Sequence, residues 1–302
     1  MWLGVDGGGT KTGFALYDDD MRLVDSFELG TCHCGQVGFD GMQRVLEEGL
    51  SEAIRRGLTE PYGIGLGICA YGGGEQTSRR MFEVVAHVAG NHPFELVNDV
   101  QAAHAASLGS KDGIVVIAGT GSVAYGVHGE ASMRCGGWDY QIGDEGSGYW
   151  MGKELVRAYS FQADGRSSKG PLYDIVKSEL GLKEDYDLID YMRNVIGNDR
   201  TKTASLSKLV SKAASKGDRD AQLIFSRAAQ EEARMIKTIA TALFPDAPEQ
   251  SIPVSYVGGT FKAGQLIFSP LKKSLPLSCV LVKPVREPAV GGCLLLRKRL
   301  NR

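Results

Sequence analysis

The sequence predicts an α/β protein built from two copies of one strand-rich unit. Predicted strands alternate with predicted helices in the first third of the chain, which is typical of a sheet with parallel strands. The order strand, glycine turn, strand, turn, strand opens the chain and recurs about 110 residues later. Glycine accounts for 40 of the 302 residues, well above the usual ~7%, and the glycines cluster at the predicted turns.

The first domain is expected to comprise residues 1–112. Its β-rich runs, bounded by turn residues, predict strands at 3–6, 12–17, 21–29, 64–70 and 94–97. Its remaining segments predict helices at 39–56, 75–89 and 101–108, the first with apolar residues spaced three or four apart.

The second domain is expected to comprise residues 113–287 with a helical insertion. Its predicted strands are 113–118, 123–128, 131–135, 254–257 and 279–282. Residues 144–244 are expected to be mostly helical, and the strongest helix, 219–243, has one apolar side and stops before Pro245. Further helices are expected from Phe261 and from Pro288.

Charge and apolar content exclude several classes of protein. The 34 basic and 36 acidic residues give a net charge of −2, so we expect neither nucleic acid nor an anionic membrane as partner. We find no signal peptide and no run of 18 apolar residues, so a cytoplasmic protein is expected. The six cysteines form no C-x-x-C pair and are expected to be reduced. A metal at Cys32-His33-Cys34 is an alternative that fits structural zinc poorly.

The first candidate site is the glycine turn at residues 6–12, DGGGTKT. Glycines let consecutive backbone N–H groups point at one anion, so we predict phosphate contacts from Gly8, Gly9, Thr10 and Lys11. Asp6 would be repelled by phosphate but can hold Mg²⁺, or Mg²⁺-bound water, beside it. The pattern is not a Walker A motif, and a structural hairpin turn is the alternative interpretation.

Two later glycine turns offer similar backbone donors. The turn at 119–122 has the same position in the second repeat as the turn at 6–12 has in the first. The two turns would therefore bind one polyphosphate from opposite sides. The turn at 258–260 links a strand to a helix and would allow a ribose or a flat ring to approach closely. A tight strand–helix connection is its alternative. The predicted ATP-binding residues here are Gly119, Thr120, Gly121, Ser122, Gly258, Gly259 and Thr260.

Asn98 and Asp99 follow the predicted strand at 94–97. Ligands of parallel α/β sheets bind beyond this end of the strands, so Asp99 is a candidate to accept the proton of an attacking hydroxyl. A helix N-cap is the alternative role for Asp99, and the spacing alone favours it.

The glycine-rich segment 136–148 combines Trp138 with the carboxylates of Asp144 and Glu145. An indole face beside hydrogen-bond acceptors suits a pyranose, which has apolar C–H faces and hydroxyl edges. A capped helix start is the alternative interpretation.

Together, these motifs are similar in order to those of a known family. They are DGGGTKT, ND at 98–99, AGTGS at 118–122, GGWDYQIGDEGSGYWMG at 136–152, VGGTF at 257–261 and EPAVGG at 287–292. The chain resembles the N-acetylglucosamine kinase branch of the BadF/BadG/BcrA/BcrD ATPase family, within the actin–Hsp70–sugar-kinase superfamily. The resemblance spans nearly the whole chain, and GDEGSGYW is its most specific part.

The resemblance implies two RNase-H-like (actin-like ATPase) domains with a duplicated βββαβαβα core. It implies an interdomain cleft that closes over ATP and a sugar, a last helix (288–302) that packs back on the first domain, and a homodimer. Asp99 would be the catalytic base. The implied sugar-binding positions are His33, Gly72, Gly73, Asn98, Asp99, Gly137, Trp138 and Asp144.

His33 departs from the family pattern, which often has an asparagine five residues before the glycine that is Gly38 here. A histidine also bonds sugar hydroxyls, but with a different reach and a titratable charge. The identity of the sugar is therefore left open.

The expected function is ATP- and Mg²⁺-dependent phosphorylation of an amino sugar, first of all N-acetylglucosamine, at the 6-hydroxyl. Glucosamine and N-acetylmuramic acid are alternative acceptors. Two other classes of function are an ATPase activator of an electron-transfer enzyme, which needs cysteines gathered around an iron–sulfur cluster, and a non-catalytic sugar sensor.

Overall fold

The computed structural model of the chain describes residues 1–301 and divides into two compact units. Unit 1 is Met1–Val115 together with the residues from Lys283 onward, and unit 2 is Val116–Val282. Each sheet has five strands, in the orders β3-β2-β1-β4-β5 and β10-β9-β6-β7-β8. When the strands of each sheet are numbered 1 to 5 along the chain, both sheets have the same order, 3-2-1-4-5. The predicted α/β fold with a duplicated core is therefore confirmed.

The first sheet consists of β1 (Trp2–Gly7), β2 (Lys11–Tyr17), β3 (Leu23–Gly30), β4 (Gly63–Ile68) and β5 (Phe94–Val97). Strands β1 to β3 form an antiparallel meander, whereas β4 runs parallel to β1 and β5 parallel to β4. The carboxyl ends of β1, β4 and β5 therefore lie at one edge, which is where ligands of such sheets bind.

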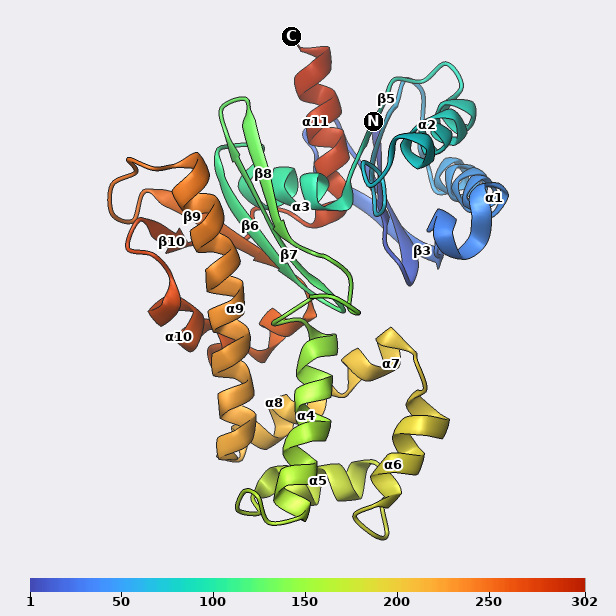
Figure 1. The fold of residues 1–302 in the computed structure, drawn as a ribbon. Coiled ribbons are helices and arrows are strands. Elements are labelled where there is room, and N and C mark those ends of the chain that lie inside the picture. The colour runs from blue at the N-terminus through green and yellow to red at the C-terminus, as the bar shows by residue number, and fades with distance from the viewer. Residues whose placement is uncertain (302) are drawn as a thin grey trace. The chain divides into compact units, whose positions relative to one another are not determined.

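Helices cover both faces of this sheet (Figure 1): α1 (Cys34–Arg55) and α2 (Glu75–Ala89) on one face, α3 (Asp99–Leu108) and α11 (Gly291–Leu300) on the other. The alternation along β4 explains the arrangement. Its isoleucines and leucine pack in the core beneath α1 and α2. Its glycines face the other way, and a Cβ at Gly65 would overlap the backbone of Cys293 in α11. Glycine is needed there because the C-terminal helix lies directly on the strand.

Helix α1 begins at Cys34, five residues before the predicted start. His33 caps it by accepting a hydrogen bond from the Gly35 N–H on Nδ1, and the helix is interrupted at Gly38, whose φ is 70°. The continuous helix therefore begins again at Phe39, which is the predicted start, and residues 34–37 form a separate turn, capped by His33, that the sequence did not predict.

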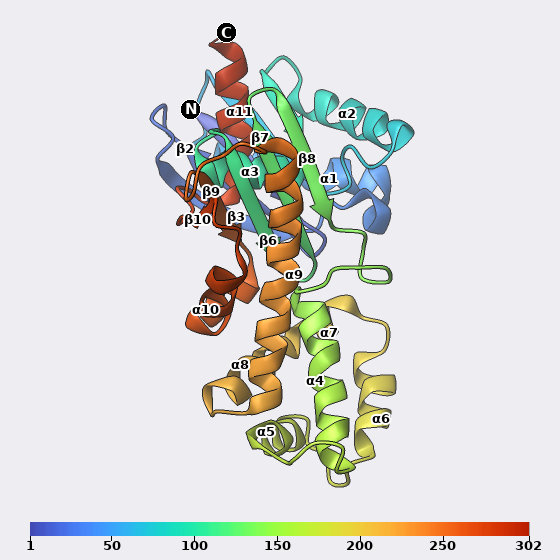
Figure 2. The ribbon, with the colours of Figure 1, turned by 60° about the vertical axis from the view of Figure 1, so that its left-hand side comes forward.

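The second sheet consists of β6 (Gly113–Ala118), β7 (Ser122–His128), β8 (Ala131–Gly136), β9 (Ile252–Val257) and β10 (Cys279–Leu281). The main helices of unit 2 are α4 (Gly148–Ala163), α5 (Pro171–Glu179), α6 (Asp187–Tyr191), α7 (Arg200–Ser205), α8 (Ser207–Ser215), α9 (Arg219–Leu243) and α10 (Gln265–Ser274). Single turns of π- or 3₁₀-helix occur at Met192–Ile196, Gly259–Ala263 and Pro288–Val290. Figure 2 shows α4 to α8 gathered around one end of the long helix α9.

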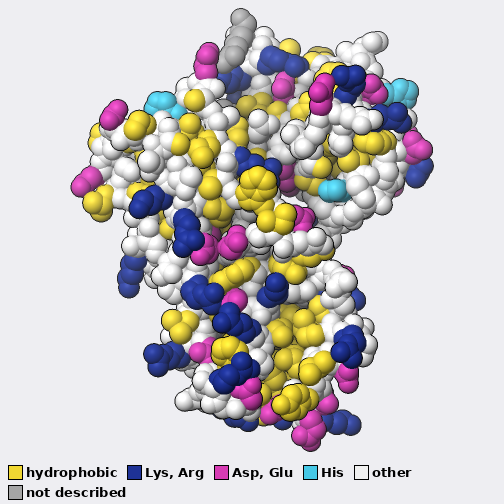
Figure 3. Space-filling view, in the orientation of Figure 1, with side chains coloured by type: hydrophobic (Ala, Val, Ile, Leu, Met, Phe, Trp, Pro, Cys, Tyr) yellow, Lys and Arg dark blue, Asp and Glu magenta, His cyan; other side chains and the backbone are white. Residues whose placement is uncertain are grey.

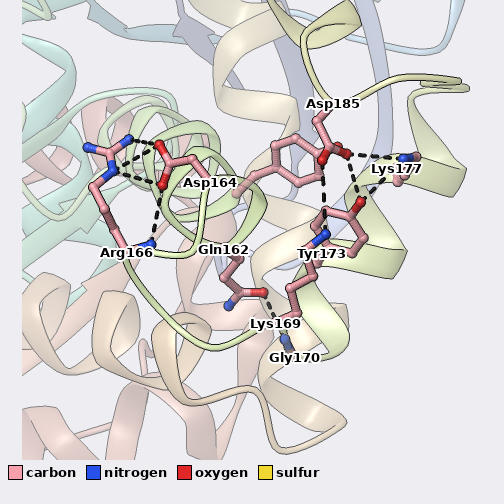
Figure 4. Close-up of polar contacts among 9 residues, drawn as sticks. Gln162, Asp164, Arg166, Lys169, Gly170, Tyr173, Lys177 and Asp185 are labelled. Carbon is pink, nitrogen blue, oxygen red and sulfur yellow. Dashed lines mark hydrogen bonds and ion pairs between the residues drawn. The ribbon is translucent and has the colours of Figure 1, made fainter.

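Buried polar side chains hold the helical part together. Asp218 caps α9 by accepting from Ala221 N–H, and it also accepts from the backbone of Leu172 at the start of α5. Figure 4 shows a neighbouring cluster in which Asp185 accepts from Tyr173 at 2.7 Å and from Lys177 at 3.0 Å. Hydrogen bonding, first of all from Tyr173, holds the pKa of Asp185 below its usual range. Across residues 1–301, none of the helices has both the length and the apolar character needed to span a membrane.

Candidate active site

The first glycine turn joins β1 to β2 and is fixed by its own hydrogen bonds. Gly8 N–H donates to the Lys11 carbonyl at 3.1 Å, so this donor is used inside the turn. The Thr31 hydroxyl donates to Gly8 O at 2.8 Å, and Gln36 Nε2 donates to Gly9 O at 2.7 Å. The predicted phosphate contacts of this turn therefore rest mainly on Gly9 and Thr10.

Thr31 and Gln36 were missed from the sequence because nothing in their local pattern links them to a turn more than twenty residues earlier. Lys11 also differs from expectation. Its ammonium group pairs with Glu28 on the adjacent strand β3, and both side chains are exposed. A phosphate would have to compete with this ion pair for the lysine.

Asp6 and Asp99 come together at the carboxyl edge of the first sheet. Asp6 is opposite Gly67 in the parallel pairing of β1 with β4. A Cβ at Gly67 would lie 2.4 Å from the Cβ of Ala102, so the missing side chain lets α3, which begins at Asp99, pack closely on β4 beside Asp6. Burial, followed by repulsion from the Asp99 carboxylate, raises the pKa of Asp6 to about 6, while Lys11 opposes the shift.

Asn98, and not Asp99, is the N-cap of α3. Its side chain accepts from Val100 N–H at 3.1 Å, and Gln101 accepts from the Asn98 N–H, which completes a capping box. The Asn98 amide also donates to the Tyr71 carbonyl at 2.7 Å, next to Gly72 and Gly73. The cap alternative for Asp99 is therefore wrong: Asp99 is the first residue inside the helix.

His33 follows β3 and is linked to the first turn through Thr31. The Thr31 hydroxyl accepts from His33 N–H at 3.0 Å and donates to Gly8 O. Because Nδ1 of His33 accepts from Gly35 N–H, the neutral ring carries its proton on Nε2. His33 therefore offers a donor where an asparagine amide would offer both a donor and an acceptor.

Unit 2 brings the second and third glycine turns against each other. Gly258 has a φ of 120°, and a Cβ there would overlap the Ala118 carbonyl and lie 2.9 Å from Gly119 N. The two turns border one cavity of about 600 Å³. Its lining includes Gly119, Thr120, Gly259, Thr260 and residues of α7 and α8, among them Lys208. This volume is in the range of nucleotide and cofactor sites.

Two properties of the cavity suit a polar ligand. The buried hydroxyl of Thr260 has no hydrogen-bond partner among residues 1–301, so it is available to a ligand. Lys208 and Lys262, two basic residues, are among its lining residues. The helical side of this cavity was not predicted from the sequence.

Trp138 presents its indole ring to solvent, with 72% of the residue exposed. It follows Gly136 and Gly137, which have φ values of 76° and 71°, and Arg134 donates to the Gly137 carbonyl at 2.7 Å. An exposed indole on an anchored glycine turn retains the chemistry expected of a sugar-stacking surface.

Asp144, one of the expected sugar-binding residues, is held by residues of unit 2. It is only 3% exposed, its Oδ2 binds Nη2 of Arg200 at 2.5 Å, and its Oδ1 accepts from Ser122 N–H at 3.3 Å. Burial raises its pKa, although Arg200 opposes the shift. The carboxylate therefore connects the second glycine turn to α7.

Another hollow lies between α4 and the segment that includes α6, where Figure 3 shows apolar side chains bordered by Lys and Arg. It has a volume of about 870 Å³ and is lined by Leu188, Ile189, Met192 and neighbouring basic residues. It contains none of the residues predicted to act on a substrate and no carboxylate. The glycine turns are therefore the better candidate for the site of chemistry.

Comparison with known proteins agrees with this arrangement. The family model described as BadF/BadG/BcrA/BcrD ATPase family matches residues 3–295. The chain is 29% identical to the N-acetylmuramic acid/N-acetylglucosamine kinase of Clostridium acetobutylicum over 99% of both chains. It is 27% identical to the N-acetyl-D-glucosamine kinase of Dictyostelium discoideum over 98% of this chain and 97% of that one. A solved structure from Chromobacterium violaceum, provisionally named an N-acetylglucosamine kinase, is 28% identical with a TM-score of 0.75 and 98% coverage of both chains.

Proposed function

Because the chain belongs to the BadF/BadG/BcrA/BcrD ATPase family, we propose that it is an ATP-dependent kinase that phosphorylates an amino sugar. Similarity to two amino-sugar kinases over nearly the whole chain supports this substrate class. The structural observation that carries the proposal is the pairing of Asp99 with Asp6 at the carboxyl edge of the first sheet. Asp99 can accept a proton, and Asp6 can bind a metal ion beside it.

ATP would be held mainly by backbone donors. The triphosphate would contact Gly9 and Thr10 of the first turn and the second turn at 119–122. The adenosine would occupy the cavity bordered by Gly259 and Thr260.

Asp99 would accept the proton of the attacking sugar hydroxyl. A bond forms between that oxygen and the γ-phosphorus, the bond from the γ-phosphorus to the β,γ-bridging oxygen breaks, and ADP leaves. Because the transition state is loose, alignment and charge neutralisation matter more than the strength of the base. The 6-hydroxyl is the proposed acceptor because it is the primary alcohol of the sugar.

Mg²⁺ fits the carboxylates of this site. The ion is commonly bound by one or two carboxylates plus phosphate oxygens, and Asp6 has a raised pKa partly because Asp99 repels its charge. Asp6 would hold the ion, directly or through water. When bound, Mg²⁺ would neutralise charge that develops on the phosphates.

The proposed sugar contacts come from His33, the loop of Gly72 and Gly73, Asn98, and the turn of Gly137 and Trp138. N-acetylglucosamine is the proposed physiological acceptor, with glucosamine and N-acetylmuramic acid as alternatives. The resemblance of the motifs to the family also supports a cytoplasmic location and a homodimer. Light scattering during gel filtration would test the homodimer.

The function is tested by a kinase screen with ATP and Mg²⁺ over N-acetylglucosamine, glucosamine, N-acetylmannosamine and N-acetylmuramic acid. We expect ADP release with at least one of these sugars and a sugar 6-phosphate by ³¹P and ¹³C NMR. ATP binding without turnover on any of the four would refute the kinase proposal. Phosphate at another hydroxyl would refute only the proposed position.

A further inference from the structure

Arg200 lies against the second glycine turn, although it comes from α7, more than seventy residues later in the chain. It is the first residue of that helix, after the N-cap Asp199. A Cβ at Gly121 would overlap Nη2 of Arg200 and would lie 2.7 Å from Oδ2 of Asp144. The guanidinium therefore occupies the space that any side chain at position 121 would need. Glycine at this position gives a permanent positive charge direct access to the turn.

Asp144 holds the guanidinium in this position. The 2.5 Å contact between Nη2 of Arg200 and Oδ2 of Asp144 involves a carboxylate that is only 3% exposed. The same carboxylate accepts from the N–H of Ser122, so turn, carboxylate and arginine form one connected group. The ring of Tyr140 lies 5.6 Å from the guanidinium carbon and packs on Tyr149 at the start of α4.

The arrangement is costly if its purpose is only structural. A buried ion pair gains little net stability, because both charges must leave water. In addition, the buried Nε of Arg200 makes no hydrogen bond to any residue from 1 to 301. The Arg200 side chain is nevertheless 35% exposed, so part of it faces solvent beside the turn. A guanidinium anchored through one nitrogen, with further donors beside a glycine turn, has the geometry that suits phosphate oxygens.

The position of α7 agrees with a role toward the nucleotide. Thr201, the next residue of the helix, lines the same cavity as Gly119 and Thr120. Arg200 therefore lies on the element that forms one wall of the proposed ATP site and touches the turn proposed to hold the triphosphate.

We propose that Arg200 binds the triphosphate of ATP, and that Asp144 is a positioning residue that orients the Arg200 guanidinium toward the triphosphate. This inference rests on the proposed function, because it assigns a residue to the ATP site. Arg200 would neutralise phosphate charge where the turn supplies only neutral backbone donors. Asp144 would act on the nucleotide through Arg200.

Titration calorimetry with the full chain tests the inference by comparing AMPPNP with adenosine. Replacing Arg200→Met should weaken AMPPNP about 10- to 100-fold, as expected for loss of a charged hydrogen bond. Adenosine, which has no phosphate, should bind Arg200→Met as it binds the wild type. Arg200→Lys should recover part of the AMPPNP affinity, because it restores the charge without the planar fork. The matched control is Arg193→Met, an arginine of unit 2 whose side chain is 72% exposed, and no change is expected there.

Asp144→Asn keeps the shape of the side chain and removes the charge that holds Arg200. It should show the same selective loss of AMPPNP affinity, with the affinity for adenosine unchanged. Equal losses for AMPPNP and adenosine, or unchanged AMPPNP affinity in Arg200→Met and Arg200→Lys, would overturn the inference. Unchanged AMPPNP affinity in Asp144→Asn would overturn the positioning role of this carboxylate. Failure of the wild type to bind AMPPNP would instead overturn the proposed function on which it rests.

Discussion

The carboxyl group of Glu232 is expected to make the protein less stable as the pH rises. Glu232 lies on α9 with no exposed surface, and neither of its carboxyl oxygens has a hydrogen-bond partner among residues 1–301. Its Cγ lies close to Gly146, in the loop that also contains Asp144: a Cβ added to Gly146 would be 3.3 Å from it. Burial raises the pKa of Glu232 well above its ordinary value, so the folded protein keeps this group neutral.

The sign and size of the effect follow from proton linkage. Below the pKa of the unfolded chain, both states are protonated and Glu232 contributes no pH dependence. Above it, the unfolded chain releases the proton while the folded protein retains it, so the free energy of unfolding falls by about 1.4 kcal/mol per pH unit. The fall continues until the pH reaches the raised pKa of the folded state. The total loss of stability therefore grows with the distance between the pKa values of the unfolded and folded states.

Glu232→Gln removes the titrating group and keeps its shape, so its stability should exceed that of the wild type by a margin that grows with pH. Urea unfolding at three pH values, followed by circular dichroism, measures the margin. The matched control is Glu231→Gln, whose side chain is 28% exposed and pairs with Arg234 at 3.2 Å. Parallel pH profiles for Glu232→Gln and the wild type would refute the reasoning.

Two further predictions concern a glycine turn and the helical part. Gly258→Ala should lower stability by about 1–3 kcal/mol and weaken ADP binding, because its φ of 120° is strained for alanine and its Cβ would overlap Ala118 O. Gly259→Ala, with no atom within 4 Å of its Cβ, is the control in thermal unfolding, and equal losses of stability in the two variants would contradict the prediction. Asp185→Asn should destabilise the helical part by about 1–2 kcal/mol, because it weakens the hydrogen bonds from two tyrosines and a lysine. In urea unfolding, Asp190→Asn, 75% exposed, should be neutral, and an equally neutral Asp185→Asn would show that the cluster contributes nothing.

Elements with a purely local signal were predicted closely from the sequence. Strand β6 at Gly113–Ala118 is an apolar run between turn residues, and helix α9 at Arg219–Leu243 has a continuous apolar stripe before Pro245. The repeated order of strands and glycine turns also predicted the duplicated sheet, because both copies depend on the same short-range pattern.

Elements that depend on special contacts were predicted less well. The helical turn before Phe39 contains Gly35 and is capped by the His33 ring, whereas Gly38 interrupts the helix with a φ of 70°. The helix expected from Phe261 is a 3₁₀ turn that ends at Gly264, whose φ is 61°, and the α-helix starts only after that residue. Neither feature follows from hydrophobic periodicity.

The sequence identified the motifs of the candidate site but not the partners of their side chains. Asp144 was expected at the sugar because it lies in a glycine-rich segment with Trp138. Its contact with Arg200 joins residues 56 positions apart and has no periodic signal in between. The same holds for the contact between Gln36 and Gly9.

The most direct test of the proposed mechanism is the rate of phosphoryl transfer by Asp99→Asn at saturating ATP and sugar. The account predicts a kcat about 10²- to 10⁴-fold below that of the wild type, with ATP affinity retained, because only the proton acceptor is lost. Asp20→Asn, in the exposed turn between β2 and β3, should keep the wild-type rate. A near wild-type rate for Asp99→Asn would contradict the assignment of the base.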